Sequence, residues 1–159
     1  MIIGSGGAGK STLAKRLGEK LHIEVIHLDA IHWRPGWVSP PDEEWKEIVE
    51  QLVKQELWII DGNFGGTIEA RLAACDTVIF LDMPRYICLW RVLKRIVTYR
   101  KSQRPDMAEG CPERIDLKFA KWIWNYPKTN KPKIVKSAVP KRPYGSIVKT
   151  SENRKIKRS

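Results

Sequence analysis

Short apolar runs alternate along the chain with longer segments of helical periodicity. The runs lack the strict apolar-polar alternation of strands that face water on one side, which indicates strands buried on both faces. The expected strands are 1–3, 23–28, 57–60 and 77–82, with a weak fifth at 146–149. The expected helices, with apolar residues three and four apart, are 10–21, 41–53, 68–74, 85–101, 113–125 and 131–138. Strands that alternate with helices predict an α/β fold, with a parallel sheet covered on both faces.

The length and composition fit a single domain, residues 1–159, with its own hydrophobic core. The 159 residues are 42% hydrophobic and include seven Trp, which excludes a wholly disordered chain. No apolar run approaches the roughly 18 residues of a membrane span, and the first residues lack a secretory signal. Cys75, Cys88 and Cys111 form no CxxC pair. We therefore expect reduced thiols in a cytoplasmic protein with no membrane contact.

The formal charge of +11 is divided unequally between the two halves of the chain. Residues 1–84 hold 8 basic and 13 acidic residues and carry −5, whereas residues 85–159 hold 21 basic and 5 acidic residues and carry +16. The second half is expected to meet an anionic partner. Composition leaves open whether this is nucleic acid or the phosphates of a small ligand.

A glycine-rich motif follows the first strand and opens the first helix. The run Gly4-Ser5-Gly6-Gly7-Ala8-Gly9-Lys10-Ser11 satisfies G-x-x-x-x-G-K-[ST], and Thr12 continues it. Glycines allow close approach of backbone N–H groups, which together with a helix N-terminus bind anions. Lys10 is expected to reach the β- and γ-phosphates of ATP, and the Ser11 hydroxyl to ligate Mg²⁺. The motif predicts a nucleoside triphosphate site.

Three carboxylates follow expected strands and lie at the edge of the sheet where ligands bind in open α/β folds. Asp61 precedes Gly62-Asn63 and is the candidate carboxylate for Mg²⁺, partly through water. Asp29 leads into an aromatic and cationic loop, 32–37, and is the candidate that faces the acceptor of a phosphoryl group. Asp82 precedes Met83-Pro84 and is interpreted as a turn or helix-entry residue.

The chain resembles the adenylate-kinase-like branch of P-loop proteins, specifically the DNA topology modulation (FlaR-type) proteins. The matching stretches span roughly residues 1–135: 3–13, 25–37 (VIHLDAIHWRPGW), 58–63 (WIIDGN), 78–95 and 104–113 (RPDMAEGCPE). The resemblance implies a three-layer P-loop NTPase fold with a five-stranded parallel sheet of order 2-3-1-4-5 and a mobile helical lid at about 98–112. It also implies ATP and Mg²⁺ as ligands and kinase-type chemistry.

Arg91 and Arg95 lie four residues apart and hence on one face of the expected basic helix. In adenylate-kinase-like proteins a similar pair contacts the adenine and the transferring phosphates, so the resemblance implies a catalytic role for both and ATP binding by Arg91. Arg100 and Arg104 are expected to add charge from the lid. His22, His27 and His32 show no metal-ligand spacing and receive no role.

The C-terminal part fits the resemblance less well. Trp122, Trp124 and Tyr126 have the spacing of a helix that packs on the sheet, although stacking on bases is the alternative. Related proteins continue into a clear last strand and a closing helix, whereas this chain ends in a basic tail, about 139–159.

Three functional hypotheses remain from the sequence. The first is a kinase that transfers the γ-phosphate of ATP to a nucleotide or another small acceptor, either anionic or hydroxyl-bearing. The second is an ATP-dependent, DNA-topology-associated regulator that binds nucleic acid through its basic half, although no recognisable nucleic-acid module is present. The third is a nucleotide sensor without turnover.

Overall fold

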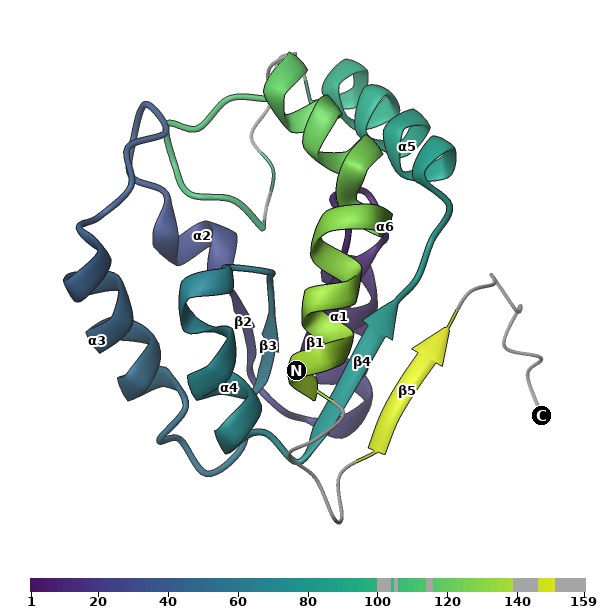
Figure 1. The fold of residues 1–159 in the computed structure, drawn as a ribbon. Helices are drawn as coiled ribbons and strands as arrows, with labels where there is room; N and C mark the ends of the chain where they lie inside the picture. Colours follow the sequence, from purple (N-terminus) through teal and green to yellow (C-terminus); the bar gives the residue numbers. More distant parts are fainter. Residues whose placement is uncertain (100–103, 105, 114–115, 139–145, 151–159) are drawn as a thin grey trace.

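The computed structural model describes residues 1–99, 104, 106–113, 116–138 and 146–150, with residues 138 and 146–150 described by their backbone alone. Strands and helices alternate through most of this part of the chain (Figure 1). In chain order the elements are β1 (Ile2–Gly4), α1 (Lys10–Leu21), β2 (Val25–His27), α2 (Leu28–His32), α3 (Asp42–Leu52), β3 (Ile59–Asp61), the 3₁₀ turn η1 (Gly65–Thr67), α4 (Ile68–Ala74), β4 (Thr77–Leu81), α5 (Arg85–Thr98), α6 (Leu117–Ala138) and β5 (Ser146–Thr150).

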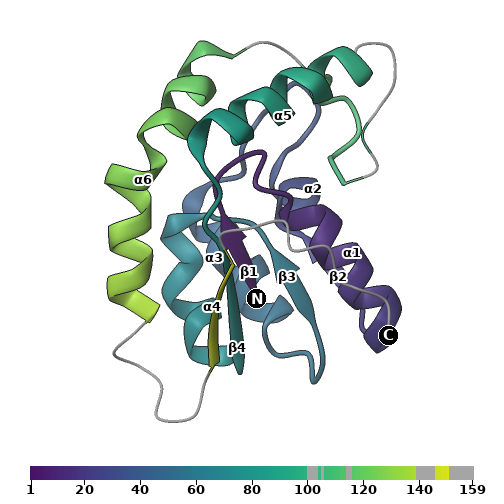
Figure 2. The same ribbon diagram turned by 90° about the vertical axis from the view of Figure 1, so that its right-hand side faces the viewer.

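The sheet is parallel, which confirms the predicted α/β architecture. Its strands are ordered β2-β3-β1-β4, and the backbone of β5 pairs in parallel with the outer edge of β4. In register, Ile2 of β1 lies beside Asp61 of β3 and Ile79 of β4. All carboxyl ends therefore meet at one edge of the sheet, where the loops after β1, β2 and β3 come together (Figure 2). That edge is where an α/β fold places its ligand.

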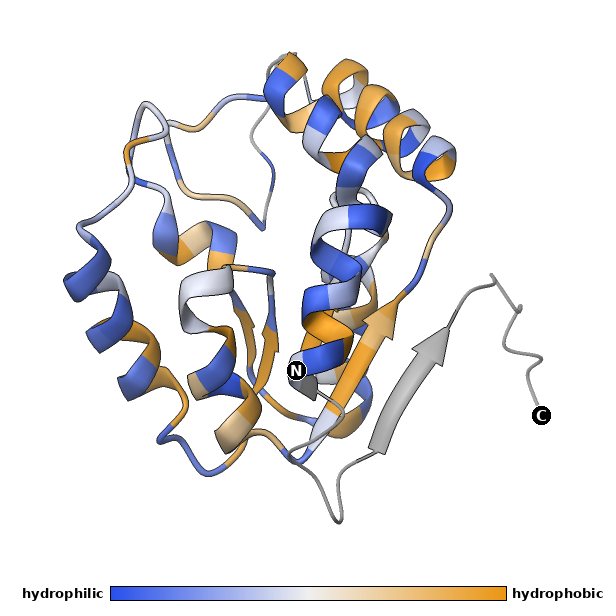
Figure 3. Cartoon of the chain, viewed as in Figure 1, coloured by the Kyte–Doolittle hydropathy of each residue, from blue (hydrophilic) through white to orange (hydrophobic). Residues whose placement is uncertain are grey.

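Three apolar clusters hold the helices to the two faces of the sheet (Figure 3). Alternation along β1 turns Ile3 toward α4 and α6, where Leu72 and Tyr126 are buried. Ile2, one residue earlier, lies in the cluster that contains Ala14 of α1 and Val92 of α5. Both positions are apolar, because a strand buried on both faces has no solvent side. The third cluster joins Trp45 and Val49 of α3 to β2 and β3.

Two expectations about the helices were wrong. The predicted helices 113–125 and 131–138 form one helix, α6, which passes through Pro127 and Pro132. Each proline removes only one backbone hydrogen bond, and burial of Ile123 and Ile134 on either side keeps the helix on the sheet. The predicted lid is also not helical in its described part beyond the end of α5 at Thr98: residues 104 and 106–112 form turns and irregular backbone. Arg100 and most of the basic tail, 139–145 and 151–159, lie outside the described residues.

Among the residues that the structure describes, no helix combines the length and the apolar character that a membrane span requires. Cys75, Cys88 and Cys111 are buried thiols, in line with the expected reduced state.

Candidate functional site

The glycine-rich loop joins β1 to α1, as the motif predicted, and its backbone conformation requires glycine. Gly7 has φ +76°, and a Cβ atom there would lie 2.3 Å from the carbonyl oxygen of Cys88 in α5. Gly9 has φ +97° and precedes the first residue of α1. A side chain at Gly7 would push α5 away, and the positive φ of both glycines disfavours any other residue.

Lys10 lies at the centre of this loop. Its Nζ donates to the carbonyl oxygen of Ser5 at 3.1 Å. Burial lowers the pKa of Lys10, and the negative charges of Asp29 and Asp61 oppose that shift. Burial also raises the pKa of Asp29, which lies in the first turn of the short helix α2, and the charge of Lys10 opposes it. Lys10 and Asp29 are both partly buried and interact electrostatically, at the place where the sequence predicted the phosphate and acceptor residues.

Asn63, which follows β3, ties two strand ends together. Its Oδ1 accepts from the Gly4 backbone N–H at 3.2 Å, and its Nδ2 donates to the Gly4 carbonyl at 2.8 Å. The Tyr126 hydroxyl also donates to Asn63 Oδ1, at 3.3 Å. The side chain thus continues the ladder between β1 and β3 past their ends and holds the beginning of the phosphate loop.

Arg71 of α4 holds the backbone of the loop that follows β3, to which Asn63 also belongs. It is fully buried and donates to the carbonyl oxygens of Gly62, Asn63 and Phe64. Burial lowers its pKa to about 10, so it stays charged at neutral pH. A buried cation is tolerated here because three carbonyl oxygens replace its water.

Asp61, the predicted metal carboxylate, accepts from His27 Nδ1 at 2.7 Å across neighbouring strands. It is 4% exposed and lies beneath the loop, within electrostatic reach of Lys10. The hydrogen bond with Asp61 raises the pKa of His27. The sequence assigned no role to His27, because its partner became visible only when β2 and β3 were paired in register.

The two predicted arginines of α5 reach different partners. Arg91 Nη1 donates to the carbonyl of Ala8 in the phosphate loop at 3.3 Å. Arg95 Nε lies 3.0 Å from Glu113 Oε1, and burial lowers the pKa of Arg95. Both side chains line the same cavity as Lys10.

Arg104 of the predicted lid is held by two carboxylates. Its Nε and Nη2 donate to the two oxygens of Asp106 at 3.0 and 2.7 Å, and Nη1 donates to Glu113 at 2.7 Å. Burial opposes the charge of Arg104, but these carboxylates keep its pKa above the ordinary value. Burial alone would raise the pKa of Asp106, yet Arg104 lowers it to about 2, helped by a hydrogen bond from Ser11.

The segment 110–112 lies against the loop 33–38 and forms a cover with it. The Gly36 N–H donates to the Gly110 carbonyl at 3.0 Å, and Trp37 Nε1 donates to the Pro112 carbonyl at 3.3 Å. The Cys111 thiol donates to the Arg34 carbonyl at 3.2 Å. These bonds join segments about 75 residues apart, and no local sequence pattern predicts such a pairing.

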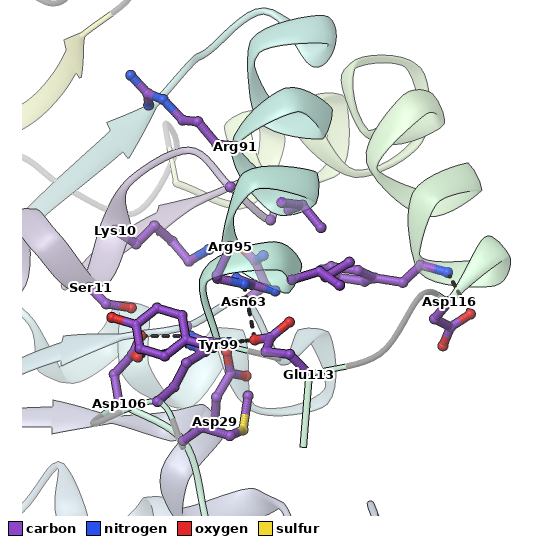
Figure 4. Close-up of a pocket in the computed structure, with 18 of the residues that line it drawn as sticks. Lys10, Ser11, Asp29, Asn63, Arg91, Arg95, Tyr99, Asp106, Glu113 and Asp116 are labelled. Carbon is purple, nitrogen blue, oxygen red and sulfur yellow. Dashed lines mark hydrogen bonds and ion pairs between the residues drawn. The ribbon is translucent and has the colours of Figure 1, made fainter. Parts of the chain in front are cut away.

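These elements enclose a cavity of about 670 Å³ (Figure 4). One part of its lining, here called the phosphate side, consists of the loop from Gly6 to Thr12 with Arg91 and Arg95. The other part, here called the aromatic side, consists of Trp33, Trp37, Phe64, Asp29 and Arg104. In Figure 4, Lys10, Ser11, Asp29, Arg95 and Asp106 gather around one space. A volume of this size accommodates two small ligands or one large one.

The donor set around Ser11 suits Mg²⁺. Its hydroxyl lies beside Asp106, and Asp29 lines the same cavity, so oxygen ligands are present at one place. The described residues hold no group of three or more His, Cys, Asp or Glu side chains arranged around a metal. Mg²⁺ in phosphate-transferring proteins is commonly held by one or two protein oxygens together with substrate phosphates and water, so the residues fit.

Other residues singled out by the sequence have structural positions. Tyr126 is buried and Trp122 packs against the core, which confirms the packing interpretation for these two. Trp124 is instead 47% exposed, with the guanidinium of Arg85 over its ring. Asp82 pairs with Lys131 of α6 at 2.7 Å, a structural contact outside the cavity.

Sequence reasoning missed Asn63, Arg71, Asp106 and Glu113 as site residues. Asp106 and Glu113 lie in the stretch 104–113 that carried the resemblance, and this was the available signal. Arg71 acts on backbone atoms close to it in sequence, whereas Asn63 acts on Gly4 of another strand, a contact that requires the packed sheet.

Comparison with known proteins agrees with this geometry. No protein-family model matches the chain. The shikimate kinase of Rhodococcus erythropolis is 32% identical over 71% of this chain and 72% of its own. The shikimate kinase of Tolumonas auensis is 33% identical over 71% of this chain and 71% of its own length. The shikimate kinase of Vibrio cholerae is 28% identical over 72% of this chain and 71% of its own length. These relatives support the kinase part of the resemblance and do not show its DNA-topology part. The chain therefore belongs to the family of P-loop kinases that includes these shikimate kinases.

Proposed function

We propose that the protein transfers the γ-phosphate of ATP to a hydroxyl group of a small molecule, with Mg²⁺. The observation that carries the proposal is the single cavity that joins the phosphate loop to the partly buried Asp29. A kinase must hold both substrates in one water-excluding space, and this cavity has a phosphate side and a second, chemically different side.

Each residue has a role that follows from its position. The N–H groups of the loop and Lys10 hold the β- and γ-phosphates, and Arg91 and Arg95 neutralise charge on the phosphates. Asp29 accepts the proton of the acceptor hydroxyl, and its raised pKa suits a general base. The acceptor oxygen forms a bond to the γ-phosphorus while the bond from that phosphorus to the β–γ bridging oxygen breaks, which releases ADP.

The Ser11 hydroxyl, with Asp106 or Asp61 acting through water, would hold the Mg²⁺ ion. Bound there, the ion would supply charge neutralisation between the β- and γ-phosphates. Because Asp106 already accepts a hydrogen bond from Ser11, the segment 104–113 brings a carboxylate to this place.

ADP release measured with a panel of acceptors tests the proposal. The panel includes shikimate, because the relatives named above are shikimate kinases. At least one acceptor is expected to raise ADP release above the rate with ATP alone. Asp29→Asn is expected to lower kcat with that acceptor by about 100-fold or more. Asp42→Asn, an exposed carboxylate at the start of α3, is the matched control and should leave kcat unchanged.

Two results would contradict the proposal. One is a panel in which no acceptor raises ADP release, which would favour the nucleotide sensor. The other is an Asp29→Asn variant that keeps full kcat, which would remove Asp29 from the chemistry.

A further inference from the structure

The charged side chains that line the cavity balance one another. Among the described residues, four cations and four carboxylates contribute to the lining: Lys10, Arg91, Arg95 and Arg104 against Asp29, Asp106, Glu113 and Asp116. Asp116 caps the first backbone N–H groups of α6 and lies apart from the others in Figure 4. An anionic acceptor would need one of these four cations to bind its negative charge.

Three of the four cations belong to the phosphate side. Lys10 and Arg91 contact the carbonyls of Ser5 and Ala8 within the loop, so both lie where a triphosphate would bind. Arg95 lies between Lys10 and Glu113 in Figure 4. A Mg²⁺-bound triphosphate still carries about two negative charges, and these three side chains match that charge with little excess.

The fourth cation, Arg104, is already bound. Three of its N–H groups donate to Asp106 and Glu113 at 2.7 to 3.0 Å, and the residue is 8% exposed. A guanidinium recognises a phosphate or carboxylate through a free pair of parallel N–H groups. Here Asp106 occupies that pair, so an anionic acceptor would compete with an internal carboxylate.

The rest of the aromatic side offers ring faces and a carboxylate. The Trp33 and Trp37 ring centroids lie 5.5 Å apart in an edge-to-face arrangement, and both rings line the cavity with Phe64. Asp29 repels an anion placed beside it. Aromatic faces bind the flat or apolar face of a ring, and a carboxylate accepts a hydrogen bond from a hydroxyl group.

We infer that the acceptor is an uncharged ring compound that carries a hydroxyl group, with nucleosides as the leading class, and that phosphomonoesters and carboxylic acids are rejected. This inference rests on the proposed function. It separates the protein's acceptor from the acid named in its shikimate kinase relatives, because Arg104, the one cation of the aromatic side among the described residues, is neutralised by Asp106 and Glu113.

Calorimetric binding to the full chain, with Mg²⁺ and a saturating non-hydrolysable ATP analogue, tests the inference without turnover. The analogue fills the ATP site, so the added compound reports the second site. The probes are the four ribonucleosides, their 5′-monophosphates and shikimate. At least one nucleoside is expected to bind at least tenfold more tightly than its monophosphate and than shikimate. Tighter binding of a monophosphate or of shikimate would overturn the inference, as would no binding by any nucleoside.

Glu113→Gln provides the matching variant. It removes the negative charge that Glu113 places beside Arg104 and Arg95, and it keeps the size of the side chain. The ratio of nucleoside to monophosphate affinity should fall at least tenfold. Glu109→Gln changes an exposed carboxylate of the same segment and should leave the ratio unchanged. An unchanged ratio in Glu113→Gln would show that the internal carboxylates do not set the selectivity.

The outcomes separate the two proposals. If a nucleoside binds as expected but no compound is phosphorylated, the proposed kinase function fails and the binding inference stands. If an anionic acceptor is bound and phosphorylated, the kinase function stands and the inference fails.

Discussion

The phosphate side and the aromatic side of the cavity are built in different ways. The phosphate side comes mostly from one continuous stretch, residues 6–12, which presents backbone N–H groups, and α5 adds Arg91 and Arg95. The aromatic side is assembled from the loops after β2 and β3 and from the segment 104–113, and it presents side chains. A backbone site depends on local conformation, whereas a side-chain site depends on how distant segments pack. The two sides should therefore respond to different kinds of mutation.

Gly7→Ala is expected to have the largest effect, because it attacks the backbone of the phosphate side. The new Cβ would lie 2.3 Å from the Cys88 carbonyl, and the positive φ is unfavourable for alanine. The free energy of unfolding should fall by about 4 kcal/mol, and ATP binding should be lost. Urea denaturation and calorimetry with ATP measure both effects. Gly65→Ala, where a Cβ meets no atom within 4 Å, is the control and should be nearly neutral.

Arg71→Leu tests the support of the aromatic side. It leaves the carbonyls of Gly62, Asn63 and Phe64 without their buried donor, which should cost about 3 kcal/mol of unfolding free energy. Because Phe64 belongs to this loop and lines the aromatic side, acceptor binding should weaken more than ATP binding. Arg71→Lys keeps the charge and should recover part of the stability. Equal losses in both affinities would show that the two sides are not separable.

The His27–Asp61 pair joins β2 to β3 and predicts a pH dependence. The pKa of His27 is raised in the folded protein above its ordinary 6.5. Its stabilising contribution is therefore fully present below about pH 6.5 and is lost as the pH rises through the folded pKa. Wild type should exceed His27→Gln in unfolding free energy by about 1 kcal/mol more at about pH 5.5 than at about pH 9. A difference that stays constant with pH would contradict the charged pair.

Trp37→Phe should have the smallest effect. It removes the hydrogen bond to the Pro112 carbonyl, which is partly exposed, and keeps a ring on the aromatic side. The expected loss of unfolding free energy is about 0.5 kcal/mol, with ATP affinity unchanged and acceptor affinity lowered a fewfold. Trp90→Phe on the exposed face of α5 is the control for a general loss of indole. A loss of ATP affinity in Trp37→Phe would show that the cover acts on both sides of the cavity.

The sequence predictions were accurate for features that depend on local conformation and inaccurate for features that depend on the packing of distant segments. The parallel sheet, the helix 68–74 and the loop that contains Lys10 and Ser11 were predicted, because apolar runs and glycine spacing report local conformation. The split of α6 into two helices was wrong, because the prolines were weighed without the burial of Ile123 and Ile134. The prediction of a helical lid was also wrong in the described part of that segment. It came from the resemblance alone, and no local pattern in the sequence supported it.

By itself, the sequence determined the elements, the phosphate loop and the presence of carboxylates at the ends of strands. These properties depend on neighbours within a few residues, so the pattern carries them. Only the tertiary structure decided which carboxylate meets which cation. It paired Asp61 with His27, gave Arg104 to Asp106 and Glu113, and brought Asp29 within electrostatic reach of Lys10. Charge partners are chosen by the packing of segments up to about 75 residues apart, and no spacing along the chain encodes that choice.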